Sequence, residues 1–224
     1  MTKIVAVSDV HGKYAPEDWI KLPPGDILLI AGDFLANYSS IRSKDAILQK
    51  VEWEGLVPLL NSLPYERVFV IAGNHEFLFE SYQYKYFQQG KVFYLEGQQI
   101  SYKGLSFYGF PWQPRFYDWA FNIPRNSKEM QELLNKIPKD TDVLISHGPP
   151  FGYGDISSRN ERCGCELMAE HLPNLKKLKL HVYGHIHPSY GRCEFPKGCI
   201  SANVSVCNER YQPVNAPQVF SIEV

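Results

Sequence analysis

The sequence has no excess of basic residues and no long apolar run. Its 23 lysine and arginine residues nearly balance 24 aspartate and glutamate residues, giving a net charge of −1. No broad positive field is therefore available to hold nucleic acid. No stretch approaches the roughly 20 apolar residues that a membrane-spanning helix needs, and the apolar run in the first ten residues is too short for a secretory signal. We therefore expect a cytoplasmic protein with no membrane or nucleic-acid partner.

The sequence also lacks linkers, internal repeats and a paired cysteine framework. Without a Gly/Ser-rich or charged linker, residues 1–224 are expected to form a single domain, and the sequence leaves the oligomeric state open. The five cysteines are an odd number, which together with a cytoplasmic location favours reduced thiols. Cys163 and Cys165 are separated by one residue, which is not the spacing of a zinc knuckle.

Short apolar runs alternate with helix-like stretches. The runs predict buried strands at Ile4–Val7, Ile27–Ile30, Val68–Ile71, Val143–Ile145 and Leu178–Val182. Helices are expected over Ser43–Ser62, Ser127–Lys136 and Glu161–His171, the first from the spacing of Ile47, Val51, Leu56, Leu59 and Leu60. Residues 190–224 are expected to form short antiparallel strands, with turns at Pro196–Gly198 and Gln212–Pro217. The alternation predicts an α/β protein.

Polar residues follow each of the five predicted strands. The clusters are "SDVHG" with Asp9 and His11, "AGDF" with Asp33, "AGNHE" with Asn74 and His75, "SHGPP" with His147, and "YGHIHP" with His185 and His187. In α/β sheets, ligands bind at the carboxyl ends of the strands. Five of the seven histidines lie in these clusters, and we interpret the other two, His171 and His181, as structural.

So many imidazole and carboxylate groups at one sheet edge predict a bound cation. Bare charges are costly to bury, whereas neutral imidazole and carboxylate both donate lone pairs to a divalent metal. The number of groups suits two ions about 3.5–4 Å apart. Oxygen and nitrogen ligands without thiolate favour Mn²⁺, with Fe, Zn²⁺, Mg²⁺ or Co²⁺ as alternatives.

The five motifs, in this order, resemble those of the calcineurin-like metallophosphoesterases. They read "DVH", "GD", "GNHE", "HGPP" and "GHIH" and span nearly the whole chain. The runs "YGFPWQPRFYDWAFNIPR" and "SANVSVCNERYQPVNAP" further resemble the MPPED-type branch, the metallophosphoesterase domain-containing proteins. The resemblance implies a four-layer α/β/β/α sandwich with mixed sheets.

The resemblance also implies a role for each site residue. Asp9, His11 and His187 would hold one metal, Asp33 would bridge both, and Asn74, His147 and His185 would hold the other. His75 would face the substrate, with Glu76 as a candidate to orient it. The run "GDFLAN" departs from relatives that carry Asp or Gly soon after the bridging aspartate, which leaves the role of Asn37 open. Some members of the branch lack the histidine that stands here at 185.

We interpret the chain as a phosphodiesterase that hydrolyses nucleotide-like or other small phosphodiesters. A hydroxide bridging the two ions would attack phosphorus, with His75 as general acid. Residues expected to bind substrate are Trp112 and Arg115, in the aromatic loop 109–122, and Asn203. The alternatives are a phosphomonoesterase, a nuclease, which the net charge disfavours, and a low-activity scaffold that binds a partner protein.

Overall fold

Two six-stranded sheets stack face to face in a computed structural model that describes residues 1–81, 84, 87–195 and 198–223. The first sheet runs in the order β14 (Gln218–Ile222), β1 (Thr2–Val7), β2 (Ile27–Ala31), β3 (Arg67–Ile71), β5 (Val92–Tyr94) and β4 (Gln88–Gln89). The second runs β12 (Gly191–Phe195), β13 (Cys199–Asn203), β11 (Leu180–Tyr183), β10 (Val143–Ser146), β7 (Leu105–Phe110) and β6 (Gln99–Tyr102). Two further short strands, β8 (Gln113–Pro114) and β9 (Asn122–Ile123), pair with each other.

Both sheets are mixed. The four inner strands of each are parallel, and the outer strands β14, β4, β12 and β6 pair antiparallel with their neighbours. The inner strands are mainly apolar because most of their residues are buried on both faces of the sheet. In β2, Ile27 and Leu29 pack between the two sheets, whereas Leu28 and Ile30 pack toward the helices.

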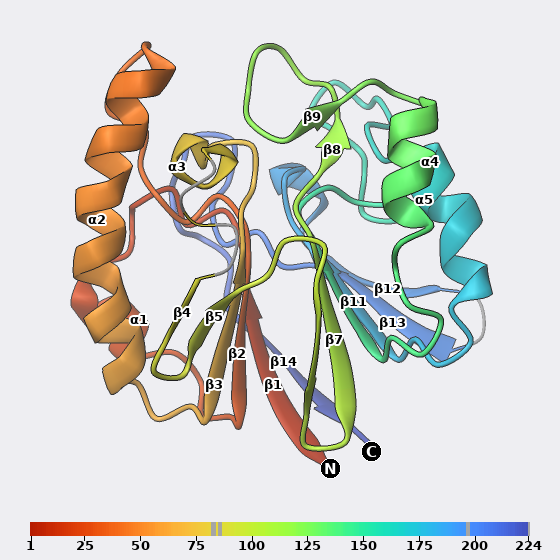
Figure 1. Ribbon diagram of the computed structural model, residues 1–224, viewed down its shortest axis with the longest axis horizontal. Coiled ribbons are helices and arrows are strands. Elements are labelled where there is room, and N and C mark those ends of the chain that lie inside the picture. The colour runs from red at the N-terminus through yellow and green to blue at the C-terminus, as the bar shows by residue number, and fades with distance from the viewer. Residues whose placement is uncertain (82–83, 85–86, 196–197, 224) are drawn as a thin grey trace.

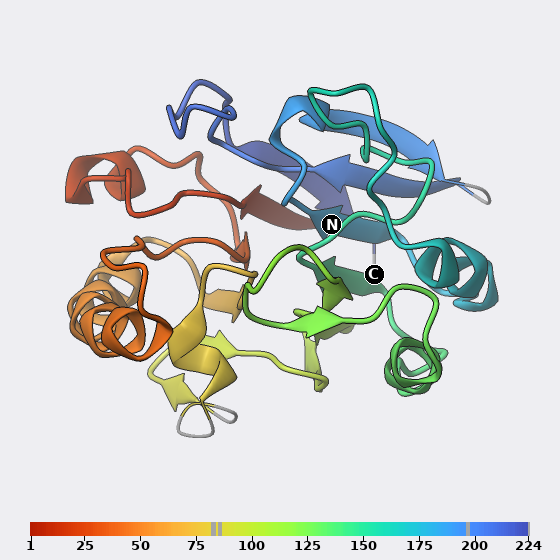
Figure 2. The ribbon, with the colours of Figure 1, turned by 90° about the horizontal axis from the view of Figure 1, so that it is seen from above.

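Helices cover the outer face of each sheet. In Figure 1, α1 (Pro16–Ile20), α2 (Arg42–Ser62) and α3 (Phe77–Glu80) lie on the side of the first sheet, and α4 (Lys128–Leu134) and α5 (Glu166–His171) lie on the side of the second. The view from above separates the same two groups (Figure 2). Short 3₁₀ helices lie at Leu172–Asn174 and His187–Ser189. The layers are therefore α/β/β/α, which confirms the predicted architecture.

Helix α2 has the predicted length but buries a different face. Ile47 and Val51 are each 67% exposed, whereas Gln49 and Trp53 are buried. The buried face meets the loop that follows β2, and Gln49 donates to the backbone carbonyl oxygens of Ala36 (3.2 Å) and His75 (2.7 Å). Trp53, Val57 and Leu60 of the helix pack in the apolar core, whereas Gln49 contacts polar backbone, which apolar spacing does not indicate.

The other predicted elements differ mainly at their ends. Ser127 caps α4 by accepting a hydrogen bond from the backbone of Met130. Helix α5 begins at Glu166, five residues later than expected, because the preceding loop is tied to Asp155, whose carboxylate accepts from the backbone of Gly152 and Gly164.

The carboxyl-terminal region contains β12, β13 and β14, of which β12 pairs antiparallel with β13 and β14 pairs antiparallel with β1. Strand β13 also pairs parallel with β11 and so continues the parallel set of the second sheet. Residues 196 and 197 of the first predicted turn lie outside the described residues, and the second turn falls in the connection between β13 and β14. Among the described helices, none combines the length and apolar character needed to cross a membrane.

Candidate metal centre

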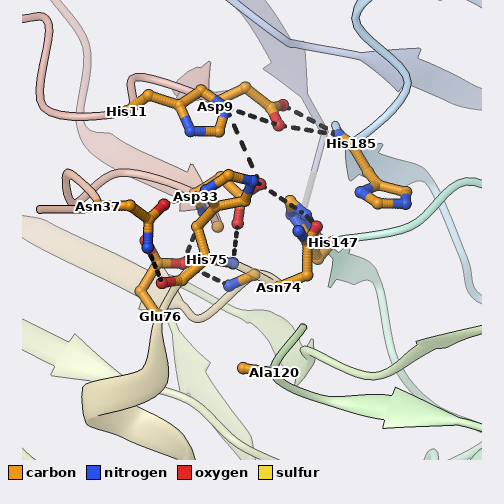
Figure 3. Close-up of polar contacts among 12 residues, drawn as sticks. Asp9, His11, Asp33, Asn37, Asn74, His75, Glu76, Ala120, His147 and His185 are labelled. Atoms are coloured by element: carbon orange, nitrogen blue, oxygen red, sulfur yellow. Dashed lines mark hydrogen bonds and ion pairs between the residues drawn. The ribbon is translucent and has the colours of Figure 1, made fainter. Parts of the chain in front are cut away.

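The loops after β1, β2, β3, β10 and β11 meet at one edge of the two sheets. Each loop delivers the side chains that the sequence motifs predict, and Figure 3 shows Asp9, His11, Asn74, His75 and His147 gathered around Asp33. The first sheet supplies Asp9, His11, Asp33, Asn74 and His75, and the second supplies His147, His185 and His187. The structure thus brings together all eight residues predicted as metal ligands or catalytic groups.

Asp33 occupies the centre of this group. Its Oδ2 atom lies 3.3 Å from Nε2 of His147, 3.8 Å from Nε2 of His75 and 3.9 Å from Nε2 of His11. Its Oδ1 atom accepts a hydrogen bond of 2.8 Å from the backbone N–H of His75. One carboxylate therefore faces rings from both sheets, as a bridging ligand must.

Asp9 forms the second acidic point of the site. Its Oδ1 atom lies 3.2 Å from Nε2 of His187 and 3.8 Å from Nε2 of His11. The backbone N–H of His185 donates to both carboxylate oxygens, and the Ser205 hydroxyl donates to Oδ2 at 2.7 Å. These donors fix the carboxylate while leaving it directed toward the two rings.

Backbone carbonyls set the orientation of two histidine rings. Nδ1 of His147 lies 3.0 Å from the carbonyl oxygen of Ala31, and Nδ1 of His187 lies 3.0 Å from that of Asn208. A carbonyl oxygen can only accept, so Nδ1 carries the proton in both rings. In each neutral ring, Nε2 then presents a lone pair to the site, which is the usual arrangement of a metal-binding histidine.

The lone pairs on Nε2 of His147 and His187 consequently face other ligand atoms inside the site. Nε2 of His147 lies 2.9 Å from Oδ1 of Asn74, and Nε2 of His11 lies 3.2 Å from Nε2 of His187. Such atoms repel unless a proton or a cation lies between them. This donor set therefore fits divalent metal ions.

The pKa shifts also indicate that either a proton or a cation must lie between these atoms. Burial alone would lower the pKa of His147, but the carboxylates of Asp33 and Asp9, together with the carbonyl oxygen of Ala31, outweigh burial and raise that pKa to about 9. Asp9 likewise raises the pKa of His187 against the effect of burial. Burial lowers the pKa of His185 to about 3 and that of His11 to about 4, which keeps both rings neutral. Without a cation, protons on His147 and His187 balance the two carboxylates.

Three groups of side chains have ligand atoms that all lie within 4.8 Å of one another. They are Asp9 with His11 and His187, Asp33 with His147 and His185, and His11 with Asp33 and His75. The first two match the ligand sets expected for two metals. The third shows that distance alone also admits His75 as a ligand.

The ring of His75 is held on two sides. Its Nδ1 atom pairs with Oδ1 of Asn37, whose amide nitrogen donates to Asp45 at 2.8 Å. Trp119, from the aromatic loop, stacks on the ring with a centroid separation of 4.2 Å. Asn37, whose role the sequence left open, thus orients His75 and leaves its Nε2 atom toward Asp33.

Glu76 does not orient His75. It is fully buried, and its two oxygens accept backbone hydrogen bonds from Asp33 (2.7 Å), Leu35 (3.0 Å) and Gly73 (2.6 Å). Burial raises its pKa to about 8, against the effect of the backbone donors. Glu76 therefore joins the loops that present Asp33 and Asn74.

Four residues of the site have left-handed backbone conformations. Their φ values range from +49° to +67°, and they are Asp9, His11, Asp33 and His185. Such conformations cost about 1–3 kcal/mol each and persist only where the surroundings enforce them. The sharp turns they create direct the side chains back over the ends of the strands.

A cavity of about 500 Å³ adjoins the His185 and His187 side of the site. Arg115 lines it, as expected of a substrate contact. Among the described residues, its guanidinium has no acidic partner, whereas Arg125 pairs with Glu166 and Arg162 with Asp155. The other residues that line this cavity are Pro114, Phe116, Ser157, Ser158, Glu161, Cys163, Ile186, Pro188, Glu209 and Tyr211.

Two expected substrate contacts lie elsewhere. Trp112 packs edge-on against Phe110 and opens onto a separate cavity of about 380 Å³. Asn203 is fully buried, and its amide nitrogen donates to the carbonyl oxygens of Gly154, Gly184 and Ile186. Asn203 therefore supports the loop of the last motif, and neither residue contacts the cavity beside the metal centre.

Residues 2–189 match the family model described as calcineurin-like phosphoesterase. The chain belongs to this family. The human protein named metallophosphoesterase domain-containing protein 1 is 35% identical to this phosphoesterase over an alignment 247 positions long, which covers 99% of the chain and 71% of the human protein. The predicted family and its MPPED-type branch are thus confirmed.

Solved structures share the fold of this phosphoesterase. A dimetal phosphatase from Danio rerio superposes with a TM-score of 0.60 at 12% identity, over 97% of this chain and 91% of that one. The protein TT1561 of Thermus thermophilus superposes with a TM-score of 0.56 at 15% identity, over 90% and 88%. At such low identity, these likenesses concern the fold alone.

Proposed function

We propose that this phosphoesterase is a dimetal phosphodiesterase that hydrolyses small, nucleotide-like phosphodiesters. The observation that supports this function most is the cavity beside His185 and His187. A diester carries a second ester group besides its leaving group, and that second group must lie next to the metal centre. The unpaired Arg115 on its wall suits an anionic substrate. The limited volume of this cavity and the net charge of −1 disfavour a nuclease.

Seven residues would hold two divalent ions, with manganese as the metal we expect. Asp9, His11 and His187 form one set, Asn74, His147 and His185 form the other, and Asp33 lies between them. When bound, such ions neutralise charge on the phosphoryl oxygens and lower the pKa of water toward neutrality. The backbone donors on Asp9 and Asp33 keep both carboxylates in place as the substrate binds.

His75 is the proposed general acid. Oδ1 of Asn37 accepts a hydrogen bond from Nδ1–H of His75. When the ring gains a second proton, that proton resides at Nε2, on the side of Asp33 and the substrate. Burial lowers the pKa of His75, which makes its protonated ring a stronger acid. Donation of the Nε2 proton to the leaving oxygen returns the ring to the tautomer that Asn37 stabilises.

The deciding experiment compares a diester with a monoester. Protein purified without chelator and supplemented with Mn²⁺ is assayed with bis-p-nitrophenyl phosphate and with p-nitrophenyl phosphate, followed by a panel of cyclic nucleotides. We expect kcat/KM to be at least about tenfold higher for the diester. Preference for the monoester would instead identify a phosphomonoesterase, and metal-loaded protein without activity on either would favour a scaffold.

A further inference from the structure

Tyr211 lies over the metal centre, although its sequence context gave no reason to select it. Its ring centroid is 4.7 Å from that of His11, 5.9 Å from that of His187 and 6.3 Å from that of His75. The residue is 43% exposed and lines the cavity of about 500 Å³. One part of the ring thus touches the site histidines while another remains open to the cavity.

The backbone of Tyr211 is held in an unfavourable conformation. Its φ of +55° is in the left-handed region, which bulky side chains rarely adopt. The carbonyl oxygen of Asn208 accepts from the backbone of Tyr211 (2.9 Å) and from Nδ1 of His187 (3.0 Å). Asn208 and Gln212 also exchange backbone and side-chain hydrogen bonds. The residue that orients a ring of the site therefore also fixes Tyr211 beside it, and strain of this kind is typical of functional positions.

A second aromatic ring lines the same cavity. Phe116, which follows Arg115 in the aromatic loop, is 47% exposed and meets the ring of His185 edge-on at 5.8 Å. Tyr211 and Phe116 thus approach the metal centre from separate loops and contact different histidines. Together they give the cavity two apolar ring surfaces next to the phosphoryl position.

We propose that Tyr211 is a specificity residue that, together with Phe116, binds a planar ester group of the substrate. This inference rests on the proposed function, since the phosphoryl group must occupy the metal centre for its ester group to extend into the cavity. Stacking on a tyrosine ring favours flat aromatic or heterocyclic groups over small alkyl groups. The substrate class is therefore phosphodiesters with an aromatic or heterocyclic substituent, and the phenol hydroxyl is dispensable for this preference.

Direct binding tests the proposal independently of turnover. Isothermal titration calorimetry of the Mn²⁺-loaded protein compares methyl phenyl phosphate with dimethyl phosphate, two diesters that differ only in one ester group. We expect the wild type to bind methyl phenyl phosphate about tenfold more tightly. Tyr211→Ala should reduce this preference to about twofold with dimethyl phosphate binding unchanged, and Tyr211→Phe should retain it.

Tyr102→Ala is the matched control, because Tyr102 pairs with Leu105 at the start of β7, at the opposite edge of the sheet. Metal content is measured for each variant, since Tyr211 contacts His11. An unchanged preference in Tyr211→Ala, or an equal loss of both esters, overturns the role of Tyr211 while leaving the proposed function intact. Wild-type protein that binds neither ester contradicts the proposed function as well.

Discussion

Close backbone approach at Gly184 gives the first prediction. A β-carbon there would lie 2.0 Å from Oδ2 of Asp9 and 2.2 Å from the Ser8 hydroxyl oxygen, so Gly184→Ala must displace a proposed metal ligand. We expect the affinity for Mn²⁺ to fall about 10–100-fold, the range found when groups that support metal ligands are altered. Calorimetric titration of the metal-free protein measures this change.

Gly55→Ala is the matched control for that substitution. Gly55 lies inside helix α2, and a β-carbon there would meet nothing within 4 Å. Alanine should raise the free energy of unfolding by about 0.5–1 kcal/mol without altering Mn²⁺ binding. If the Gly184→Ala and Gly55→Ala variants bound Mn²⁺ with equal affinity, Asp9 would not be held against Gly184 as described.

His75 gives the second prediction at this scale. His75→Ala should lower kcat about 10²–10⁴-fold, the usual contribution of a general acid, and leave two metal ions bound. Metal analysis together with kinetics on bis-p-nitrophenyl phosphate distinguishes the roles. His171→Ala, in α5, serves as the control and should leave both measurements unchanged. A folded His75→Ala protein that has lost metal would show that His75 is a ligand, as its distance to Asp33 permits.

The residues that sequence reasoning could select are those with chemistry of their own. Histidine and aspartate after buried strands indicated the metal centre, and the structure assembles them at one edge. Asn208 was missed because its contribution is a backbone carbonyl, which any residue has. Tyr211 was missed because its selection depends on a fold of the chain that brings residue 211 against residue 11. Asn203 was expected to bind substrate because an amide can serve a ligand, but the same group can support a loop, as its contacts with Gly154, Gly184 and Ile186 do.

At the scale of elements, polar residues hold helix α2 in place alongside its apolar residues Trp53, Val57 and Leu60. Asp45 accepts hydrogen bonds from the backbone of Tyr38 and Ser39 and from the side chain of Asn37, and it is fully buried. Together with Gln49, it attaches the helix to the loop that orients His75. Periodicity predicts that a helix exists, but it cannot identify buried polar residues such as Asp45 and Gln49, whose partners are backbone groups.

His181 gives a prediction for the contact between β10 and β11. Its Nε2–H donates to the Ser146 hydroxyl (2.7 Å), and burial lowers its pKa to about 3, so the native ring stays neutral. The unfolded chain binds a proton there below about pH 6.5, which the native state does not, so stability falls as the pH falls. Between pH 7 and pH 5, this one group should lower the free energy of unfolding by about 2 kcal/mol.

Urea unfolding of the metal-free protein at both pH values measures the loss. His181→Gln retains a partner for Ser146 but cannot be protonated, so its loss should be smaller by about that amount. The difference between the two proteins isolates His181 from the other titrating histidines. Parallel pH dependences for the two proteins would mean that the unfolded state gains no proton at this position.

At the scale of the molecule, the apolar pattern of buried parallel strands predicted an α/β protein, and the resemblance to the metallophosphoesterases implied its four layers. The sequence also predicted where the strand ends meet, because parallel strands in a sheet share one edge. Arg115 was expected to bind substrate, but the sequence could not place Phe116 and Tyr211 in the same cavity, since they come from loops whose paths depend on long-range contacts. Loop 109–122, for example, is fixed by a hydrogen bond that the backbone N–H of Ala120 donates to the carbonyl oxygen of Asn74.

Metal binding to the whole protein should release protons. The raised pKa values of His147 and His187 mean that the metal-free site is protonated near neutral pH, and a cation must displace those protons. We expect about one to two protons to be released at pH 7.5 and the affinity for Mn²⁺ to increase up to about pH 9. Calorimetry in Tris and in HEPES detects the release, because the two buffers differ in ionisation enthalpy. Equal heats in both buffers would contradict it.

The two halves of the centre belong to different sheets, and the apolar layer between the sheets sets their separation together with the hydrogen bonds that His185 and Ser205 donate to Asp9. Phe69 of β3 and Phe107 of β7 meet in that layer with ring centroids 4.8 Å apart. A smaller side chain at either position would let the sheets move closer or slide, and Asp33 would then no longer match His147. Catalytic rate is accordingly a sensitive measure of core spacing, and deep interior variants can silence this phosphoesterase without touching any polar group.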